Sequence, residues 1–146
     1  MAEICLYGGA VMCLVFHARA STKDVDAVFR PSSEVRFAVE EIAQRHGLPD
    51  DWLNDGVKGF LANHPQVEYL MLSNLRVFVP SADYLLAMKA MSARFDSRDK
   101  DDVIFLIRHL DLLKADEVFQ ILEKYYPRNT IKPATQFFIE EIMETL

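Results

Sequence analysis

The stretch "YGGAVMCLVFHARASTKDVDAVF", residues 7–29, decides the fold of the first half of the chain. A short apolar strand over residues 3–7 runs into a Gly8-Gly9 corner. An apolar segment over residues 10–18 follows and is long enough for a buried helix. Residues 24–30 then alternate acid, Val, acid, Ala, Val, which predicts a second strand.

Two carboxylates, Asp24 and Asp26, lie two residues apart in that second strand. Side chains at i and i+2 of a strand share a face, so these acids should project to the same side. Mg²⁺ accepts such oxygen ligands together with nucleotide phosphates and water, which orients a triphosphate for in-line attack. The alternative is a solvated edge strand, because the pattern also arises by chance; Asp99-Lys100-Asp101 repeats it in a predicted helix, where such residues do not share a face.

The context of the acids favours a phosphate site over chance. Backbone N–H groups at a helix start after a glycine turn can bind phosphate, although a Gly-Gly pair is more often only a tight turn. Arg19 and Lys23 lie in the loop just before the acids and would add positive charge for a polyphosphate. Together these features predict a metal and nucleotide site at the corner.

The remainder of the first half predicts one helix and two more strands. Pro31-Ser32-Ser33 closes the second strand, and Gly47 is placed to end the helix that follows. Residues 48–65, around Trp52 and Phe60, suggest short helical turns pinned by aromatic rings. Strands are expected over residues 67–72 and 75–79. The helix's predicted buried positions are Val35, Ala38, Val39, Ile42 and Ala43.

From Pro80 onward the pattern is helical. Ser81 is predicted to cap a helix over residues 82–94 and Ser97 one over 98–110, while Asp116 and Pro133 start two more. The predicted fold class is therefore α/β (α+β), with a small mixed β-sheet flanked by helices and a helical C-terminal half. We expect a single domain, 1–146, with a sheet lobe over about 1–79 and a helical lobe over about 80–146.

Composition narrows the class of protein. Of 146 residues, 51% are apolar and 26% charged, and no uncharged apolar run is long enough to span a membrane, so we expect a globular, cytoplasmic protein without a signal peptide. The net charge of −6 argues against an extended grip on nucleic acid. Cys5 and Cys13 have no Cys or His at ligand spacing and are expected to be buried, reduced thiols.

A second candidate group lies in the helical half. On predicted helices, Lys89 shares a face with apolar residues, and Asp99 and Asp102 prolong an apolar stripe. Such a lysine usually reaches water or pairs with a carboxylate. The functional alternative is that Lys89 neutralises phosphate while an acid orients it or activates the acceptor. Both interpretations predict a contact from Lys89 to Asp99 or Asp102.

The segment over residues 7–29 resembles the signature of the nucleotidyltransferase superfamily, which has the polymerase-beta-like fold. The resemblance is greatest to the AbiEii/AbiGii-type toxin nucleotidyltransferases and their small uncharacterised relatives. These carry an Arg-x-Ser/Thr-x-Asp-x-Asp run, approximated here by Arg19, Ser21 or Thr22, Asp24 and Asp26. They also carry a later Lys followed by Arg-Asp-x-x-Asp, matched at Lys89, Arg98, Asp99 and Asp102.

The resemblance implies a nucleotidyltransferase-like sheet and a Mg²⁺-dependent enzyme that transfers a nucleoside monophosphate from an NTP to an acceptor hydroxyl. Asp24 and Asp26 would be catalytic and hold the metal, and Lys89, Asp99 and Asp102 would also be catalytic. The implied nucleotide-binding residues are Gly8, Gly9, Arg19, Ser21, Thr22 and Lys23. The acceptor could be RNA or protein, and a cognate toxin or antitoxin partner is implied; the alternative is a catalytically degenerate member that binds nucleotide or protein.

Two features depart from the family pattern. Many members have a third carboxylate on a neighbouring strand, where this chain has Arg76 and Phe78, with Glu68 as the only acid of the preceding strand. Relatives also usually have a helix before the first strand, so an uncovered apolar face there is expected to favour a homodimer. A third interpretation is a structural α/β module whose acids are only solvated.

Overall fold

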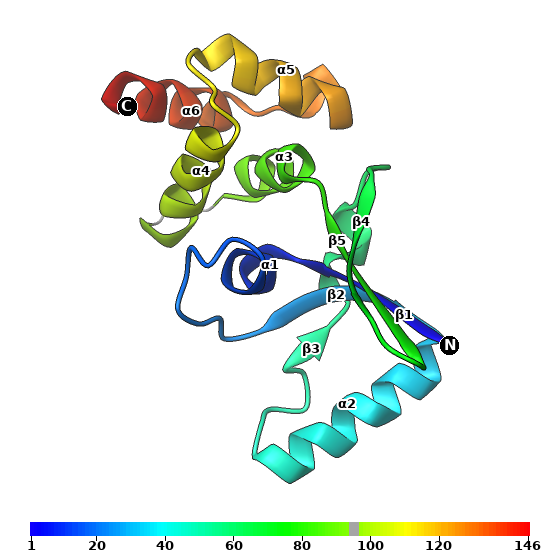
Figure 1. Ribbon diagram of the computed structural model, residues 1–146. Coiled ribbons are helices and arrows are strands. Elements are labelled where there is room, and N and C mark those ends of the chain that lie inside the picture. Colours follow the sequence, from blue (N-terminus) through cyan, green and yellow to red (C-terminus); the bar gives the residue numbers. More distant parts are fainter. Residues whose placement is uncertain (94–96) are drawn as a thin grey trace. The chain divides into compact units, whose positions relative to one another are not determined.

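The computed structural model describes residues 1–93 and 97–146, and it has the mixed α/β architecture that the sequence predicts (Figure 1). The chain divides into two compact units. The sheet unit comprises Met1–Leu61 and Gln66–Pro80, and the helical unit comprises Ala62–Pro65 and Ser81–Leu146. Within the described ranges, no helix has the length and apolar character needed to cross a membrane.

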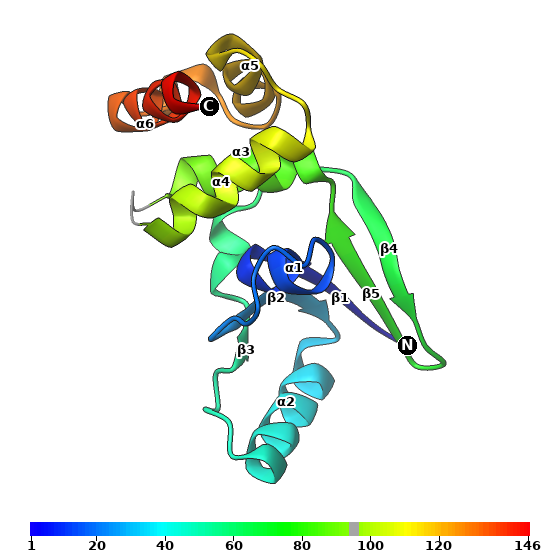
Figure 2. The ribbon, with the colours of Figure 1, turned by 60° about the vertical axis from the view of Figure 1, so that its left-hand side comes forward.

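Five strands form one sheet in the sheet unit, in the order β3-β2-β1-β5-β4 (Figure 2). β1 (Ala2–Tyr7) is the central strand, antiparallel to β2 (Val25–Arg30) and parallel to β5 (Leu75–Pro80). β4 (Gln66–Met71) forms an antiparallel hairpin with β5, and β3 (Leu53–Asn54) lies parallel to β2 at the other edge. The four longer strands confirm the prediction, whereas two-residue β3 is too short to leave an alternating pattern.

The first helix, α1 (Gly8–Leu14), is shorter than the apolar segment over residues 10–18 predicts. Its chain turns back at His17, which has a left-handed φ of 53°, and Ala18 N–H donates to Met12 O at 2.9 Å. Apolar residues beyond the helix end stay partly buried without being helical. The prediction of a buried helix is therefore confirmed for its first residues, Ala10, Val11 and Met12, and is wrong for its length and for exposed Leu14 and Ala18.

The second helix, α2 (Ser32–His46), ends as predicted at Gly47, whose φ of 66° is the left-handed conformation that favours glycine. Its buried face is narrower than predicted, because α2 lies at the periphery of the sheet unit and packs along one row of residues (Figure 1). That row consists of Val35, Val39 and Ala43, whereas Ala38 and Ile42 are exposed.

The segment after α2 contains the predicted helical turn, a 3-10 helix over Gly56–Phe60 (η1). Trp52 ties this segment to α2, since its indole Nε1 donates to Val39 O at 3.0 Å. Phe60, the second aromatic residue of the segment, is 73% exposed.

The helical unit contains α3 (Ala82–Ser92), α4 (Ser97–His109), α5 (Ala115–Tyr125), the 3-10 helix η2 (Arg128–Thr130) and α6 (Pro133–Thr145). These helices begin within a residue of the predicted starts. The predicted end of the first at residue 94, and the side chain of Ser97 predicted as a cap, lie outside the described part of the chain. The fully buried core side chains include Tyr84, Leu85, Leu86, Val103, Leu106, Ile107, Val118, Leu122, Ile139 and Ile142.

The start of α3 shows why residues 62–65 belong to the helical unit. Ser81 is the N-cap residue of α3 as predicted, but its side chain makes no capping hydrogen bond to the backbone. Its Oγ donates instead to Asp83 Oδ1 at 2.6 Å, and that carboxylate oxygen accepts the N–H of Tyr84 at 2.8 Å. The Tyr84 hydroxyl in turn accepts the N–H of Ala62 at 3.0 Å, and the ring of His64 stacks on Tyr84 at 3.9 Å. Asp83 therefore supplies the cap, and Tyr84 anchors the preceding segment.

Candidate functional site

Asp26 lies beside the Gly8-Gly9 corner in the sheet unit. The β1–β2 ladder pairs Tyr7 with Asp26, so α1 begins directly next to this carboxylate. A Cβ added to Gly8 would lie 3.0 Å from Asp26 Oδ2, and Gly8 has a left-handed φ of 61°. Glycine alone accommodates both the close approach and this backbone conformation. At the predicted corner, the backbone of Gly8 therefore lies close to the Asp26 carboxylate.

The loop between α1 and β2 folds over the second glycine of the corner. A Cβ on Gly9 would lie 2.7 Å from Thr22 Oγ1 and 2.9 Å from Arg19 Nη1. Thr22 Oγ1 donates to the carbonyl of Asp24 at 3.0 Å, which holds the loop in this position. A guanidinium and a hydroxyl therefore lie at the same corner as the Asp26 carboxylate, over a backbone that carries no side chain in the way.

Asp24 is placed differently from Asp26. The strand predicted to start at Asp24 begins at Val25, whose N–H donates to Trp52 O at 2.7 Å because β3 pairs there. The side chain of Asp24 is exposed, as are those of Ser21 and Lys23 in the same loop. Asp26, by contrast, is only partly exposed. The two acids thus have unequal environments, one against the corner and one open to water.

The helical unit holds the second predicted group. Lys89 on α3 and Asp102 on α4 form an ion pair with Nζ and Oδ2 2.7 Å apart, and their side chains are only 10% and 3% exposed. The predicted lysine contact is therefore made to Asp102. Asp99 lies in the first turn of α4 and is partly exposed. The pair neutralises two charges inside the packed helices, as buried charges require.

Neither β5 nor β4 places a third carboxylate beside β2. On β5, Arg76 and Phe78 alternate with buried Val77 and Val79, and the strand contains no acid. Glu68 is on β4, three strand spacings from β2, or roughly 14 Å away. Among residues 1–93 and 97–146, the structure contains no group of three or more His, Cys, Asp or Glu side chains placed to hold a metal.

Two carboxylates nevertheless suit Mg²⁺. This ion keeps several waters and is usually held by one or two carboxylates plus substrate phosphates rather than by a complete protein cage. Asp26 supplies hard oxygen donors at the corner, Arg19 adds a positive charge there, and exposed Asp24 lies two residues before Asp26 in the chain. The donor set therefore fits a magnesium ion that arrives with a nucleotide better than a resident structural metal.

Sequence reasoning missed Asn54, the residue paired with Asp26 on the β3 side. Its side-chain oxygen accepts the N–H of Gly56 at 3.1 Å and its Nδ2 donates to Asp51 O at 3.3 Å. Asn54 therefore shapes the turn that closes the β3 edge beside the acid. The signal was present in "PDDWLND", but a two-residue strand could not be recognised from it.

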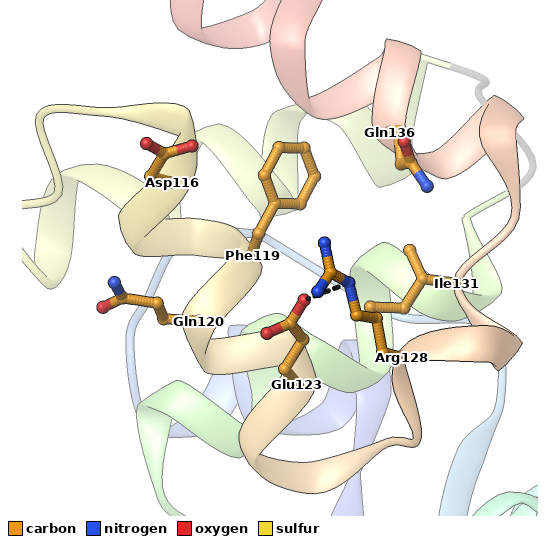
Figure 3. Close-up of a pocket in the computed structure, with 7 residues that line it drawn as sticks. All are labelled: Asp116, Phe119, Gln120, Glu123, Arg128, Ile131 and Gln136. Atoms are coloured by element: carbon orange, nitrogen blue, oxygen red, sulfur yellow. Dashed lines mark ion pairs between the residues drawn. The ribbon is translucent and has the colours of Figure 1, made fainter.

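A pocket of about 290 Å³ lies in the helical unit, and none of the predicted site residues lines it (Figure 3). Arg128 and Glu123 point toward one another there, with Nε and Oε1 3.4 Å apart. Phe119 and Ile131 provide the apolar part of its wall, and the other lining residues are Asp116, Gln120 and Gln136. Most of these side chains are exposed, which makes the pocket an open surface depression.

Comparison with protein-family models, with curated proteins and with solved structures finds no match for this chain.

Proposed function

We propose that the chain is a Mg²⁺-dependent nucleotidyltransferase that moves a nucleoside monophosphate from an NTP to an acceptor hydroxyl. The observation that carries the proposal is the approach of Asp26, Thr22 and Arg19 to the Gly8-Gly9 corner, within 2.7–3.0 Å of where glycine Cβ atoms would stand. A carboxylate, a hydroxyl and a guanidinium around bare backbone are groups that bind a metal-complexed polyphosphate.

Each group has a role in the proposal. Arg19 would bind phosphate oxygens, and Thr22, tied to the carbonyl of Asp24 at 3.0 Å, would keep the loop and its acid in place. Asp26 and Asp24 would hold the ion, which supplies charge neutralisation at the transferring phosphate. Exposed Ser21 and Lys23 would contact the outer part of the nucleotide. Catalysis would then consist mainly of positioning and electrostatic stabilisation.

The helical unit supports the proposal less directly. Lys89 and Asp102 already neutralise each other in a buried pair, so their support for a catalytic role, with that of Asp99, comes from the resemblance alone. The acceptor, RNA or protein, and a cognate toxin or antitoxin partner belong to the proposal on the same ground. The structural support for the proposed function therefore lies in the sheet unit.

The second candidate is a catalytically degenerate member of the same fold that binds nucleotide or a protein partner. Arg76 and Phe78 favour it, because they occupy the β5 positions where an acid would complete the carboxylate set. Two carboxylates can hold a metal–nucleotide complex without assembling the full site needed for turnover. Both candidates allow the chain to bind a metal–nucleotide complex, but only the first transfers a nucleoside monophosphate.

The test combines transfer with binding. Labelled NTPs, Mg²⁺ and total RNA or cell extract should give labelled product, and Asp24→Asn and Asp26→Asn should lower the labelling by at least about a hundredfold. Calorimetry should show NTP binding that requires Mg²⁺ and weakens in both variants. Asp101→Asn is the matched control, since Asp101 belongs to the second acid-x-acid triplet and is exposed on α4.

The outcomes separate the candidates. Equal labelling by the wild type, Asp24→Asn and Asp26→Asn would overturn the enzymatic assignment. Mg²⁺-dependent binding without transfer would replace it with the degenerate member, and neither transfer nor binding would leave the acids as solvated residues of a structural module.

A further inference from the structure

β4 forms an outer edge of the sheet (Figure 2), and most of its exposed side chains are apolar. All six residues of Gln66–Met71 are exposed, and β4 is the last strand in the sheet order. Soluble proteins usually protect such an edge with lysine, proline or a bulge. β4 has a register shift between Glu68 and Leu70, but it contains neither lysine, arginine nor proline.

The exposed side chains of β4 continue the buried face of the sheet. Val67 is paired with Val79 and Leu70 with Val77, and cross-strand partners lie on the same face. Val79 and Val77 are only 5% and 8% exposed, whereas Val67 and Leu70 are 51% and 44% exposed. The apolar side chains on this face of the sheet therefore continue from β5, where they are buried, to the edge strand β4, where they are exposed.

We propose that the chain forms a homodimer in which β4 pairs antiparallel with β4 of a second copy, joining the two sheets. β1, where the sequence predicts an uncovered apolar face, is instead a central strand with Cys5, Leu6 and Tyr7 buried. A two-fold axis makes such an interface self-complementary, since the same strand is used on both sides. The backbone groups of both outer edges would gain hydrogen-bond partners.

The area of the patch is sufficient for a weak dimer. Val67, Tyr69, Leu70, Met71 and Leu72 are 41–53% exposed, which leaves roughly 80 Å² on each residue and about 400 Å² per copy. These side chains lie on both faces of β4 and at its end, so strand pairing covers each of them only in part and two copies would bury less than about 800 Å² of apolar surface. An area of this size is typical of weak, transient interfaces.

The charge on the strand also suits a second copy. Glu68 is the only charged residue of Gln66–Met71, so no cluster of like charges opposes the pairing. A two-fold axis near Leu70 would keep the two Glu68 carboxylates roughly 13 Å apart along the joined strands. This inference does not depend on the nucleotide chemistry of the proposed function.

Sedimentation equilibrium of the full chain over a wide concentration range tests the proposal. The wild type should pass from monomer to dimer as concentration rises. Leu70→Lys and Val67→Lys should each weaken dimerisation at least tenfold, because they bury a charge in the joined face. Phe37→Lys is the matched control: Phe37 is a large apolar residue on α2, 69% exposed and away from the β4 edge, and its substitution should leave dimerisation unchanged.

Hydrogen exchange of the wild type gives a second measurement that requires no variant. Amides of Gln66–Met71 should become more protected as concentration rises, while amides of α2 should not change. A monomer at all concentrations, a dimer unaffected by Leu70→Lys, or protection that appears elsewhere and not on β4 would each overturn the proposal.

Discussion

Removing Asp102 should destabilise the helical unit severely. Asp102→Ala leaves the Lys89 ammonium, 10% exposed, without the carboxylate that lies 2.7 Å from it. Breaking a buried pair at one partner costs about 3–5 kcal/mol, because the other charge stays buried without compensation. Domains of this size are stable by only about 5–15 kcal/mol, so the variant would lose a large fraction of its free energy of unfolding.

Replacing both partners should restore most of that loss. In the double variant Lys89→Met, Asp102→Leu, side chains of similar volume fill the space without any charge to desolvate. We expect its free energy of unfolding to lie within about 1 kcal/mol of the wild type or above it. A double variant that is as stable as the wild type but transfers no label would give the pair a catalytic role, whereas full transfer would make it purely structural.

Urea unfolding followed by two spectroscopic probes shows whether the loss of stability occurs in the helical unit or in the sheet unit. Far-UV ellipticity is dominated by the helical unit, while fluorescence of the single tryptophan, Trp52, reports on the sheet unit. Glu123→Ala is the control, because its ion pair with Arg128 is exposed and should contribute less than about 1 kcal/mol. If Asp102→Ala shifts the ellipticity midpoint no more than Glu123→Ala, the buried pair does not stabilise the helical unit as argued.

Two further predictions concern the corner and the cap of α3. Gly8→Ala should cost about 1–2 kcal/mol, because φ is 61° and the new Cβ would stand 3.0 Å from Asp26 Oδ2; Gly59→Ala, with open space around it, should be close to neutral in the same thermal melts. Partial burial opposes ionisation of Asp83, but hydrogen bonds to its carboxylate outweigh this and lower its pKa from 3.8 to about 2. Its contribution, about 1 kcal/mol after solvent screening, should be complete above pH 4 and lost as the pH falls through 2, and Asp83→Asn should remove this pH dependence of unfolding.

Much of the fold could be predicted because its signals are local. The apolar run of β1, the alternation over β2 and β5, and the glycine at the end of α2 depend on neighbours within one segment. The Gly8-Gly9 corner was recognisable for the same reason. Two predictions were wrong. The apolar residues after Leu14 were expected to be helical and are not, and Ala38 and Ile42 were expected to be buried but are exposed because α2 packs along only one row of residues.

The candidate site was predicted as residue types, and the tertiary structure decided their geometry. The spacing of Asp24 and Asp26 suggested equal partners, but pairing of β2 with β3 left Asp24 outside the strand and exposed. The fold of the α1–β2 loop placed Arg19 and Thr22 against Gly9, which no periodicity encodes.

By itself, the sequence determined the four longer strands, the starts of the helices in the helical unit, where the chain turns at glycine, and that Lys89 contacts an acid. The tertiary structure decided that Lys89 pairs with Asp102, and that β4 is an outer strand of the sheet whereas β1 is central. The physical reason is that the spacing of apolar residues reports on one helix or strand at a time. Which side chains pair, and which become buried, depends on how the loops bring distant segments together.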